Sequence, residues 1–593
     1  MIERRIRWRQ MPWLAVCVVW VAAALAYALL RWEAIGSLRF FDTDDALRMV
    51  QVRDLLSGQA WFDLRQTRIV GLGDGPMHWS RLVDLPLAAS VAGLTPLLGA
   101  GGAERMAATL VPLLLLFATM AIAARIASQF LDTAAAVAAA IALAAMPIVF
   151  LQFGPLRIDH HGWQALLLLA ATWALSWRNA ARGAFAAGAA MAAGTSISLE
   201  LLPMAAVVGA VFACRWMCSR RDGAHLLAYL QTLAAGLVLL FLLTRGVADL
   251  APHCDAIAPP HLALFSVVAL GVGVVVRLKH LALAGQVGAL ALTAAAAGAV
   301  FAAAAPQCVG SPFGQLDPLV HRYWYLNVKE GMPLWEQPAK FVLLALPPVI
   351  LGIAGCAMLA ARSRDWLRRW WSEYLFVLVM ATVAGLLTSR SILYASVLAA
   401  VPVGWLASRA FLAAAEIKRP VPKLACTAVV PLILLPALPV AMAEPVLAAS
   451  NQQHQNREEL EKGCDVTAIA ATLNRLPPGM VLAQIDLGPH VLAHTRHDVM
   501  ATGHHRGDAG MHAVIRTFTD PGSEGASRLA TTGAHYVLAC MPMTEMQIYL
   551  TNGHADSLAA MVHHSRTPPG WERVDVAPPF TLWRRASAPA ARP

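Results

Sequence analysis

The sequence predicts a polytopic α-helical membrane protein with a small α/β domain outside the membrane. Hydrophobic residues make up 58% of the 593 residues and charged residues only 14%, whereas soluble domains carry about 25% charged residues. Runs of roughly 20 apolar residues, long enough to cross a bilayer core of about 30 Å, recur up to residue 444. Beyond this point shorter apolar runs such as "MVLAQIDLG", "AHYVLACM" and "FTLWRR" are typical of strands.

We predict about thirteen membrane-spanning helices. They lie near residues 11–30, 106–125, 133–152, 163–177, 183–199, 201–217, 224–244, 262–276, 281–304, 341–361, 374–389, 391–408 and 424–444. With a cytoplasmic N-terminus every inner loop carries Arg or Lys, which is the positive-inside pattern, and the C-terminus lies outside. A further span at 82–100 would break this pattern, so we expect a helix in or near the outer interface there. The first span is expected to remain as a signal anchor.

The predicted organisation is a transmembrane domain over residues 1–444 and an extracytoplasmic α/β domain over residues 445–593. The transmembrane domain has three polar outer loops, 31–105, 153–162 and 305–340. Four cysteines also fall outside, namely Cys254, Cys308, Cys464 and Cys540. They allow three pairings into two disulfides, and buried free thiols are an alternative of similar weight.

Two outer loops carry clusters of acidic and imidazole side chains. Asp42, Asp44 and Asp45 lie within "FFDTDDALR", and Asp159 and His161 lie within "RIDHHGW". Carboxylates this close repel one another unless a cation compensates, and such oxygen and nitrogen ligands suit Mg²⁺ or Mn²⁺. If the two loops meet, Asp44, Asp159 and His161 form a metal shell. The alternative is that the carboxylates only cap or charge helix starts.

Two further charged residues of the outer loops are candidate site residues. Glu330 lies in the segment "NVKEGMPLW", where its alternative role is a salt bridge to Lys329, Arg322 or another loop cation. Arg390 lies between two spans on the outer side, against the charge trend. A guanidinium matches phosphate oxygens, whereas snorkelling to the headgroups is its alternative role. Glu200 is expected at the outer end of a span beside Pro203.

The ordered set of these motifs is specific. "FFDTDDALR", "PMHWSRLVDLPLA", "DHH", "VKEGMPLW" and "SRSILYA" follow one another along the chain. In this order they resemble the motifs of oligosaccharyltransferase catalytic subunits, particularly the archaeal and bacterial single-subunit forms, within the GT-C class of membrane glycosyltransferases. The resemblance covers nearly the whole chain, and it implies a GT-C-like fold with thirteen spans and an outer C-terminal domain.

The resemblance implies a role for each matching residue. Asp44 would activate the acceptor and bind the metal, and Asp42 is the alternative because the doubled motif permits either register. Asp159 and His161 would be further metal ligands, with His160 facing elsewhere. Glu330 would reach the metal or the acceptor. Arg390 would hold the donor phosphate.

The chain departs from the family in the segment that reads the acceptor. The family has Trp-Trp-Asp-Tyr-Gly, and the corresponding place here is "QIDLG", which keeps Asp486 and Gly488 only. Asp486 is therefore the expected acceptor contact, and an Asn-x-Ser/Thr acceptor is in doubt. Six histidines follow between positions 490 and 512 without a standard metal-ligand spacing. We expect them to be acceptor contacts or surface residues.

The predicted function is metal-assisted transfer of a sugar or oligosaccharide from a polyprenyl-(pyro)phosphate donor to a protein or glycan acceptor at the outer face of a bacterial inner membrane. No nucleic-acid partner is expected. The first alternative is an enzyme that uses a polyprenyl-monophosphate sugar to modify lipid or polysaccharide. The second is a transporter or flippase of lipid-linked sugar, which would place ionisable residues in the middle of spans.

Overall fold

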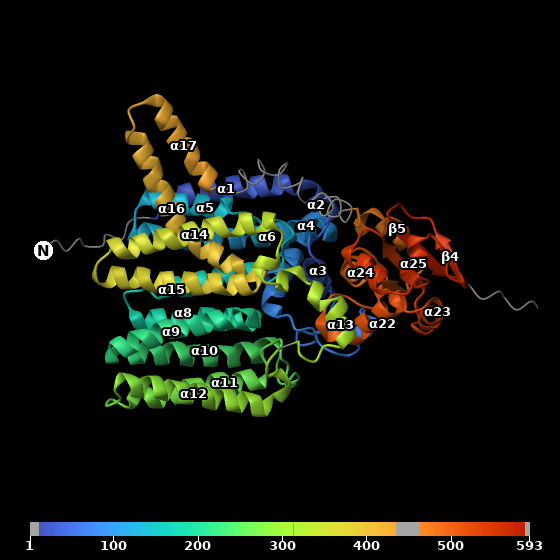
Figure 1. Cartoon of the computed structure of the whole chain (residues 1–593), viewed down its shortest axis with the longest axis horizontal. Helices are drawn as coiled ribbons and strands as arrows, with labels where there is room; N and C mark the ends of the chain where they lie inside the picture. Colours follow the sequence, from blue (N-terminus) through green and yellow to red (C-terminus); the bar gives the residue numbers. More distant parts are fainter. Residues whose placement is uncertain (1–10, 312, 435–462, 587–593) are drawn as a thin grey trace, which may run out of the picture. The chain divides into compact units, whose positions relative to one another are not determined.

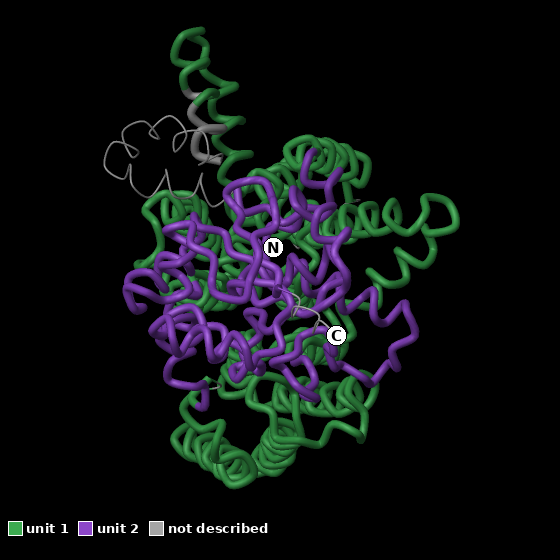
Figure 2. The backbone as a smooth tube through the Cα atoms, turned by 90° about the vertical axis from the view of Figure 1, so that its right-hand side faces the viewer, with its two compact units in different colours: residues 1–32, 79–314, 329–444 green, residues 33–78, 315–328, 445–593 purple. Residues whose placement is uncertain are grey.

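The computed structural model describes residues 11–434 except 312, and residues 463–586. The chain divides into two compact units, drawn in different colours in Figure 2. Unit 1 comprises residues 1–32, 79–314 and 329–444. Unit 2 comprises residues 33–78, 315–328 and 445–593. Each unit is therefore assembled from three separate stretches of chain.

Unit 1 is helical, and Figure 1 shows its helices α8 to α12, α14 and α15 running roughly parallel. Its helices are α1 (Trp13–Leu30), α4 (Arg81–Phe130), α5 (Thr133–Ala145), α6 (Pro147–Phe153), α7 (His161–Ala174), α8 (Ala180–Ile197), α9 (Leu202–Cys218), α10 (Gly223–Thr244), α11 (Pro259–Arg277), α12 (Leu283–Ala304), α14 (Ala339–Arg362), α15 (Asp365–Leu387), α16 (Ile392–Glu416) and α17 (Pro420–Leu434).

The predicted class of helical membrane protein is confirmed, but the number thirteen is not. Within the described residues nine helices are long and apolar enough to cross a membrane, or up to ten if α5 and α6, which meet at a bend of 70°, form one broken span. The predicted spans at 163–177 and 183–199 correspond to α7, which has 14 residues, and α8. Neither is among the nine. The last predicted span, 424–444, lies partly outside the described residues.

The segment predicted to lie near the outer interface is the first part of α4. This helix of 50 residues is interrupted at Gly99, where φ is 68° and ψ is 166°. A positive φ is costly for residues with a Cβ but not for glycine. Gly99 therefore separates the segment that begins at Arg81 from the apolar segment that ends at Phe130. The sequence predicts a similar division, between a helix at 82–100 and a membrane span at 106–125.

Small residues allow the helices of unit 1 to pack closely. α16 packs against α5 and α14. A Cβ placed on Gly404 would lie 2.3 Å from the backbone nitrogen of Ala139, and one on Gly352 would lie 2.5 Å from the Cβ of Ala399. Because the bilayer supplies no hydrophobic driving force between helices, such close backbone approach is a main source of association in membranes.

Unit 2 is built on a five-stranded sheet of order β2-β1-β3-β5-β4. Its strands are β1 (Met480–Ala483), β2 (Asp498–Val499), β3 (Tyr536–Cys540), β4 (Trp571–Val574) and β5 (Phe580–Arg585). Its helices are α2 (Trp32–Ser37), which begins at the boundary with unit 1, α3 (Thr43–Leu56), α13 (Pro318–Tyr323), α20 (Ala470–Arg475), α21 (Gly488–His494), α22 (Asp508–Thr519), α23 (Gly522–Thr531), α24 (Thr544–Asn552) and α25 (Leu558–His563).

The predicted α/β character of the C-terminal region is confirmed. β1 pairs in parallel with β2 and β3, whereas β5 pairs antiparallel with β3 and β4. All residues of β1 and β3 are buried, which explains why these strands read as continuous apolar runs. The segment "REELEKGCDVTAIAATLNRL", which precedes β1, begins outside the described residues, and its described part contains α20.

The segment 33–78 is part of the same unit because it pairs with the end of β2 and the residue that follows it. α3 packs against α21. Ile69 forms a parallel bridge with Val499, and the backbone N–H of Gly71 donates to the carbonyl of Met500 at 2.9 Å. A Cβ on Gly71 would lie 2.3 Å from the Cα of Gly510, so glycine is required for this approach.

Two disulfides join the four cysteines predicted to be outside. Cys254 pairs with Cys308 within unit 1, and Cys464 pairs with Cys540 within unit 2. This selects one of the three pairings that the sequence allows, and the free-thiol alternative is wrong for these four residues. Loop closure by a disulfide reduces the conformational entropy of the unfolded chain.

We expect Gly404→Val to destabilise unit 1 by about 1–3 kcal/mol, because the added methyl groups overpack the contact between α16 and α5. The matched control is Gly298→Val in α12, where an added Cβ meets nothing within 4 Å. Thermal unfolding in detergent micelles measures both variants. Equal unfolding midpoints for the two variants would show that the contact is not tight.

Candidate active site

Polar side chains gather in unit 1 where four breaks in its helices meet. The first break is the loop 154–160 before α7. The others are short 3₁₀ turns, η2 (Leu199–Leu201) before α9, η6 (Lys329–Gly331), and η8 (Ser389–Ser391) before α16. The hydroxyl of Ser389 donates to the carbonyl of Glu330 at 3.0 Å, and its backbone N–H donates to the carbonyl of Met332 at 2.9 Å. These bonds attach η6 to η8.

Two imidazoles lie between two carboxylates in this cluster. His160 Nδ1 lies 2.7 Å from Asp159 Oδ1, and His161 Nε2 lies 3.4 Å from Asp159 Oδ2. Glu200 Oε2 lies 3.6 Å from both His160 Nε2 and His161 Nδ1. Asp159, His160 and His161 are each less than 9% exposed. Each carboxylate therefore compensates part of the cost of burying the rings.

Arg390 extends the cluster to a third carboxylate. Its Nη2 lies 2.7 Å from Glu200 Oε1, and its Nη1 donates to Glu330 Oε1 at 3.1 Å. Beside it, the hydroxyl of Tyr394 on α16 donates to the side-chain oxygen of Gln164 on α7 at 3.0 Å. The guanidinium thus joins η2, η6 and η8, while the tyrosine holds α16 to α7.

The two imidazoles have opposite charge preferences. Burial alone would lower the pKa of His160, but the carboxylates of Asp159 and Glu200 outweigh it and raise that pKa to about 10. Burial and the neighbouring charge of His160 lower the pKa of His161 to about 4. At neutral pH His160 is therefore a cation and His161 a neutral ring. Three carboxylates then face two cations, so the cluster keeps negative charge.

The cluster fits a small divalent cation. Ligand atoms of Asp159, His160 and His161 lie within 4.8 Å of one another. Two ligands on opposite sides of an ion with bonds of about 2.0–2.6 Å are separated by about 4–5 Å, so one ion can contact Asp159 and His161, whereas His160 would first have to lose its proton. Neutral imidazole nitrogen and carboxylate oxygen are both suitable donors.

The structure brings four predicted site residues together and assigns the other three to unit 2. Asp159, His161, Glu330 and Arg390 converge as described. Asp42 and Asp44 lie at the start of α3, and Asp486 lies in the turn η10 (Ile485–Leu487). The shell of Asp44, Asp159 and His161 draws on both units and stays a prediction.

Three expectations about these residues need correction or refinement. His160 does not face elsewhere, because it contacts Asp159 and lies beside Glu200. The N-cap residue of α7 is His160, not Asp159. At the other acidic cluster, Asp42 is the N-cap of α3 and its Oδ1 accepts from the backbone N–H of Asp44 at 3.0 Å.

Glu200 is the functional candidate that the sequence motifs missed. It is the partner of Arg390 and of both histidines, yet it belongs to none of the short motifs. The available signal was its position, a carboxylate at the end of an apolar run. Ionisable residues at membrane-spanning segments are costly and mark functional sites by default.

Asp486 lies beside a second carboxyl group in unit 2. Backbone N–H groups of Ile485 and Asp486 donate to the carboxylate oxygens of Glu545 at 2.7 and 3.1 Å, and Tyr549 also contacts this carboxylate. Burial and the charge of Asp486 raise the pKa of Glu545 to about 8, although these donors act to lower it. Asp486 therefore lies in a rigid turn next to a group that is protonated at neutral pH.

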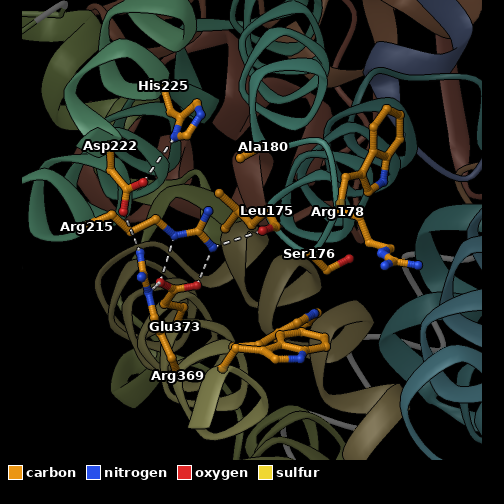
Figure 3. Close-up of a pocket in the computed structure, with 12 residues that line it drawn as sticks. Leu175, Ser176, Arg178, Ala180, Arg215, Asp222, His225, Arg369 and Glu373 are labelled. Carbon is orange, nitrogen blue, oxygen red and sulfur yellow. Dashed lines mark hydrogen bonds and ion pairs between the residues drawn. The ribbon is translucent and has the colours of Figure 1, made fainter. Parts of the chain in front are cut away.

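A separate polar pocket lies at the opposite ends of α7 and α15 (Figure 3). It has a volume of about 360 Å³ and is lined by residues that follow α7 and by the first turns of α15. Arg215 and Arg369 both pair with Glu373, and Arg369 also reaches Asp222 at 3.4 Å. These ion pairs join α9, η3 (Arg220–Asp222) and α15. The pocket contains none of the residues predicted for catalysis.

Comparison with solved structures identifies the fold. The chain matches the oligosaccharyltransferase AglB from Archaeoglobus fulgidus in complex with an inhibitory peptide and a dolichol-phosphate, with 15% identity, a TM-score of 0.63, and coverage of 98% of this chain and 75% of AglB. The chain has the oligosaccharyltransferase fold. The same archaeal enzyme tethered to an acceptor peptide with an NVT sequon matches at 15% identity and a TM-score of 0.65, over 98% of this chain and 75% of the other.

A third structure of that enzyme, in complex with Zn and sulfate, matches at 15% identity and a TM-score of 0.60, over 96% of this chain and 73% of the other. No family model and no curated protein sequence matches the chain. At this level of identity the likeness confirms the fold that the ordered motifs predicted, namely an oligosaccharyltransferase-like GT-C arrangement. The chemistry must be argued from the residues themselves.

We expect Glu200→Gln and Arg390→Met to destabilise the fold singly, each by on the order of 2–3 kcal/mol, because each leaves a largely buried charge without its partner. The double variant should lose less than the sum of the two, since neither charge remains. Equilibrium unfolding in mixed micelles measures the cycle. Strictly additive losses would mean that the ion pair does not couple η2 to η8.

We expect the stability of unit 2 to fall by up to a few kcal/mol as pH rises from about 5 to 8, because folded Glu545 retains a proton that the unfolded chain releases near pH 4.3. Glu545→Gln should flatten this slope. Glu572→Gln, which alters an exposed carboxylate paired with Arg584, is the control and should keep it. An unchanged slope in Glu545→Gln would contradict the raised pKa.

Proposed function

We propose that this chain is a membrane glycosyltransferase that moves a sugar or oligosaccharide from a polyprenyl-(pyro)phosphate carrier to an acceptor outside the membrane. The observation that carries this proposal is the convergence of Asp159, His161, Glu330 and Arg390, which come from three separated motifs, in one partly buried cluster. Within a fold that helices dominate, the cluster lies at helix ends rather than in the middle of spans, which disfavours a transporter.

Arg390 is the proposed donor-phosphate ligand. A guanidinium has five N–H donors in a planar fork that matches phosphate oxygens. Two of its nitrogens contact Glu200 and Glu330 in the structure, and these contacts fix the orientation of the fork. Phosphate binding would use the donors that remain, or would displace Glu330, which is the more exposed of the two partners.

Asp159 and His161 are the proposed ligands of a divalent cation, Mg²⁺ or Mn²⁺, and we include Asp44 or Asp42 as a third ligand. The negative charge of the cluster and the neutral form of His161 support this assignment. Such an ion would supply charge stabilisation for the departing phosphate. The AglB structure with Zn and sulfate concerns an enzyme of the same fold, and the ion that this chain takes remains part of the proposal.

Acceptor activation is assigned to carboxylates. Glu330 and either Asp44 or Asp42 would orient the acceptor or accept its proton, and Asp486 would contact the acceptor from unit 2. The acceptor class we propose is a protein or a glycan. The structure of the archaeal enzyme contains a peptide with an NVT sequon. The segment "QIDLG" of this chain lacks the two tryptophans and the tyrosine that accompany sequon recognition in the family. We therefore do not extend that sequon to this chain.

The proposed location is a bacterial inner membrane. The distribution of Arg and Lys supports a cytoplasmic N-terminus and a periplasmic C-terminal region. The two disulfides support an oxidising compartment for Cys254, Cys308, Cys464 and Cys540.

We expect Asp159→Asn and Arg390→Lys to lower release of sugar from a lipid-linked donor by about 10²-fold or more. The first removes a carboxylate ligand of the proposed cation, and the second keeps the positive charge but loses the planar fork of donors. Hydrolysis of labelled donor by the purified protein needs no knowledge of the acceptor. The matched control is Asp249→Asn, since Asp249 also pairs with an arginine and a histidine, Arg245 and His253, but lies outside the cluster.

Full donor turnover by both variants in the presence of Mg²⁺ or Mn²⁺ would contradict the proposed site. A donor panel separates the two enzyme classes. Use of pyrophosphate-linked oligosaccharide supports the primary proposal, whereas exclusive use of polyprenyl-monophosphate sugars supports the alternative that the sequence left open.

A further inference from the structure

The polar pocket of Figure 3 lies at the ends of three helices that are long and apolar enough to cross a membrane. Arg215 belongs to the last turn of α9, His225 to the first turn of α10, and the first turns of α15 complete the wall. The cluster of Asp159 and Arg390 precedes α7, whereas the pocket follows it, so the 14 residues of α7, about 21 Å, separate the two. The pocket therefore faces the other side of the membrane.

The carboxylates of this pocket are already shared between bases. Glu373 accepts from Arg215 Nε at 2.8 Å and from Arg369 Nε at 3.0 Å. Asp222 lies 3.4 Å from Arg369 Nη2 and 3.3 Å from His225 Nδ1. Figure 3 shows these contacts as one connected network. The carboxylate oxygens of the pocket are therefore committed to cationic and imidazole groups within it.

Other side chains of the pocket carry donors that no acceptor uses within the part of the chain that the structure describes. Arg178 has no hydrogen bond or ion pair there, and Figure 3 shows it apart from the network. The indole N–H groups of Trp177 and Trp370 are buried without a partner. Guanidinium and indole groups donate hydrogen bonds but cannot accept them. A ligand that supplies acceptor oxygens is therefore the kind that fits this pocket.

Charge and size narrow the class of ligand. The three arginines that line the pocket outnumber its two carboxylates, which favours an anion. A guanidinium fork matches the oxygens of a phosphate. The volume of about 360 Å³ is at the lower end of the range of about 300–1,000 Å³ that is usual for ligand pockets. This space suits a phosphate-bearing head group.

The surroundings favour a lipid as the source of that phosphate. Trp177, Trp366 and Trp370 line the pocket, and tryptophan is enriched where membrane helices meet the head groups. The loops on this side, 178–182, 215–221 and 362–369, carry arginines of the positive-inside pattern. Basic pockets between membrane helices on the cytoplasmic side are typical binding sites for anionic head groups.

We propose that this pocket binds the phosphate of an anionic phospholipid, with Arg178 as its ligand. The segment between α7 and α8 would gain a further attachment by this contact. In the structure Arg215 Nη2 donates to the carbonyl of Leu175 at 2.9 Å, which joins this segment to α9. The proposal is independent of the proposed glycosyl transfer, because the pocket contains no residue of the Asp159 and Arg390 cluster.

The test uses the full-length protein, delipidated in a neutral detergent and titrated with phosphatidylglycerol, with native mass spectrometry to count the bound lipid. We expect one phosphatidylglycerol per chain to bind more tightly than any further lipid. Arg178→Gln should weaken this binding by at least about tenfold, because a hydrogen bond from a charged donor is lost. Arg178→Lys keeps the charge but not the fork, and it should weaken the binding less.

Two controls separate this site from general attraction and from the other cluster. Arg182→Gln removes an exposed arginine of α8 that does not line the pocket, and it should bind as the wild type does. Arg390→Lys alters the proposed donor site and should also retain the phosphatidylglycerol. Loss of the lipid in Arg390→Lys but not in Arg178→Gln would overturn the proposal.

Lipid and soluble phosphate are distinguished by competition. Inorganic phosphate at the same concentration should not displace the phosphatidylglycerol, and phosphatidylcholine should bind more weakly. Displacement by inorganic phosphate would assign the pocket to a soluble anion and overturn the lipid proposal. Equal binding of phosphatidylcholine, or wild-type affinity in Arg178→Gln, would overturn it as well.

Discussion

The ion pair between Glu200 and Arg390 is the contact on which the rest of the site depends. Glu200 is the partner of both histidines, so without the guanidinium the single cation of His160 would have to compensate both Glu200 and Asp159. Arg390 also holds Glu330, which keeps the turn η6 at the cluster. Removing one partner of a buried ion pair destabilises a protein more than replacing both partners, because the remaining charge is left buried without a counter-charge. The three turns η2, η6 and η8 are therefore one electrostatic unit.

The same contact constrains how an anion can bind. A phosphate that approaches Arg390 meets a cation already shared between two carboxylates, in a cluster that keeps negative charge overall. Recruitment of a positive ion beside Asp159 and His161 would reverse that charge and make the guanidinium available. The arrangement therefore favours binding of the cation before binding of the phosphate. Each of the two then increases the affinity of the site for the other.

The sequence predicted what depends on local pattern and charge. Long apolar runs identified most helices, shorter ones identified β1, β3 and β5 of unit 2, and the ordered motifs identified Asp159, His161, Glu330 and Arg390 as candidate site residues. It did not identify Glu200, because a single carboxylate at the end of a helix carries no periodic signal, and its role arises only where η2 meets η8. The prediction that His160 faces elsewhere failed because motif matching carries no information on ring orientation.

The three-part composition of unit 2 has a consequence for biosynthesis. Residues 33–78 emerge early, but the strand edge and the glycine contact that complete their fold belong to residues 445–593. At about 5–20 residues per second, the interval between residues 78 and 445 is roughly 20–70 s, during which α3 and its acidic turn await their partners. Assembly of unit 2 is thus the last step of synthesis, and a chain truncated before residue 445 would carry the Asp159 and Arg390 cluster without the last stretch of unit 2.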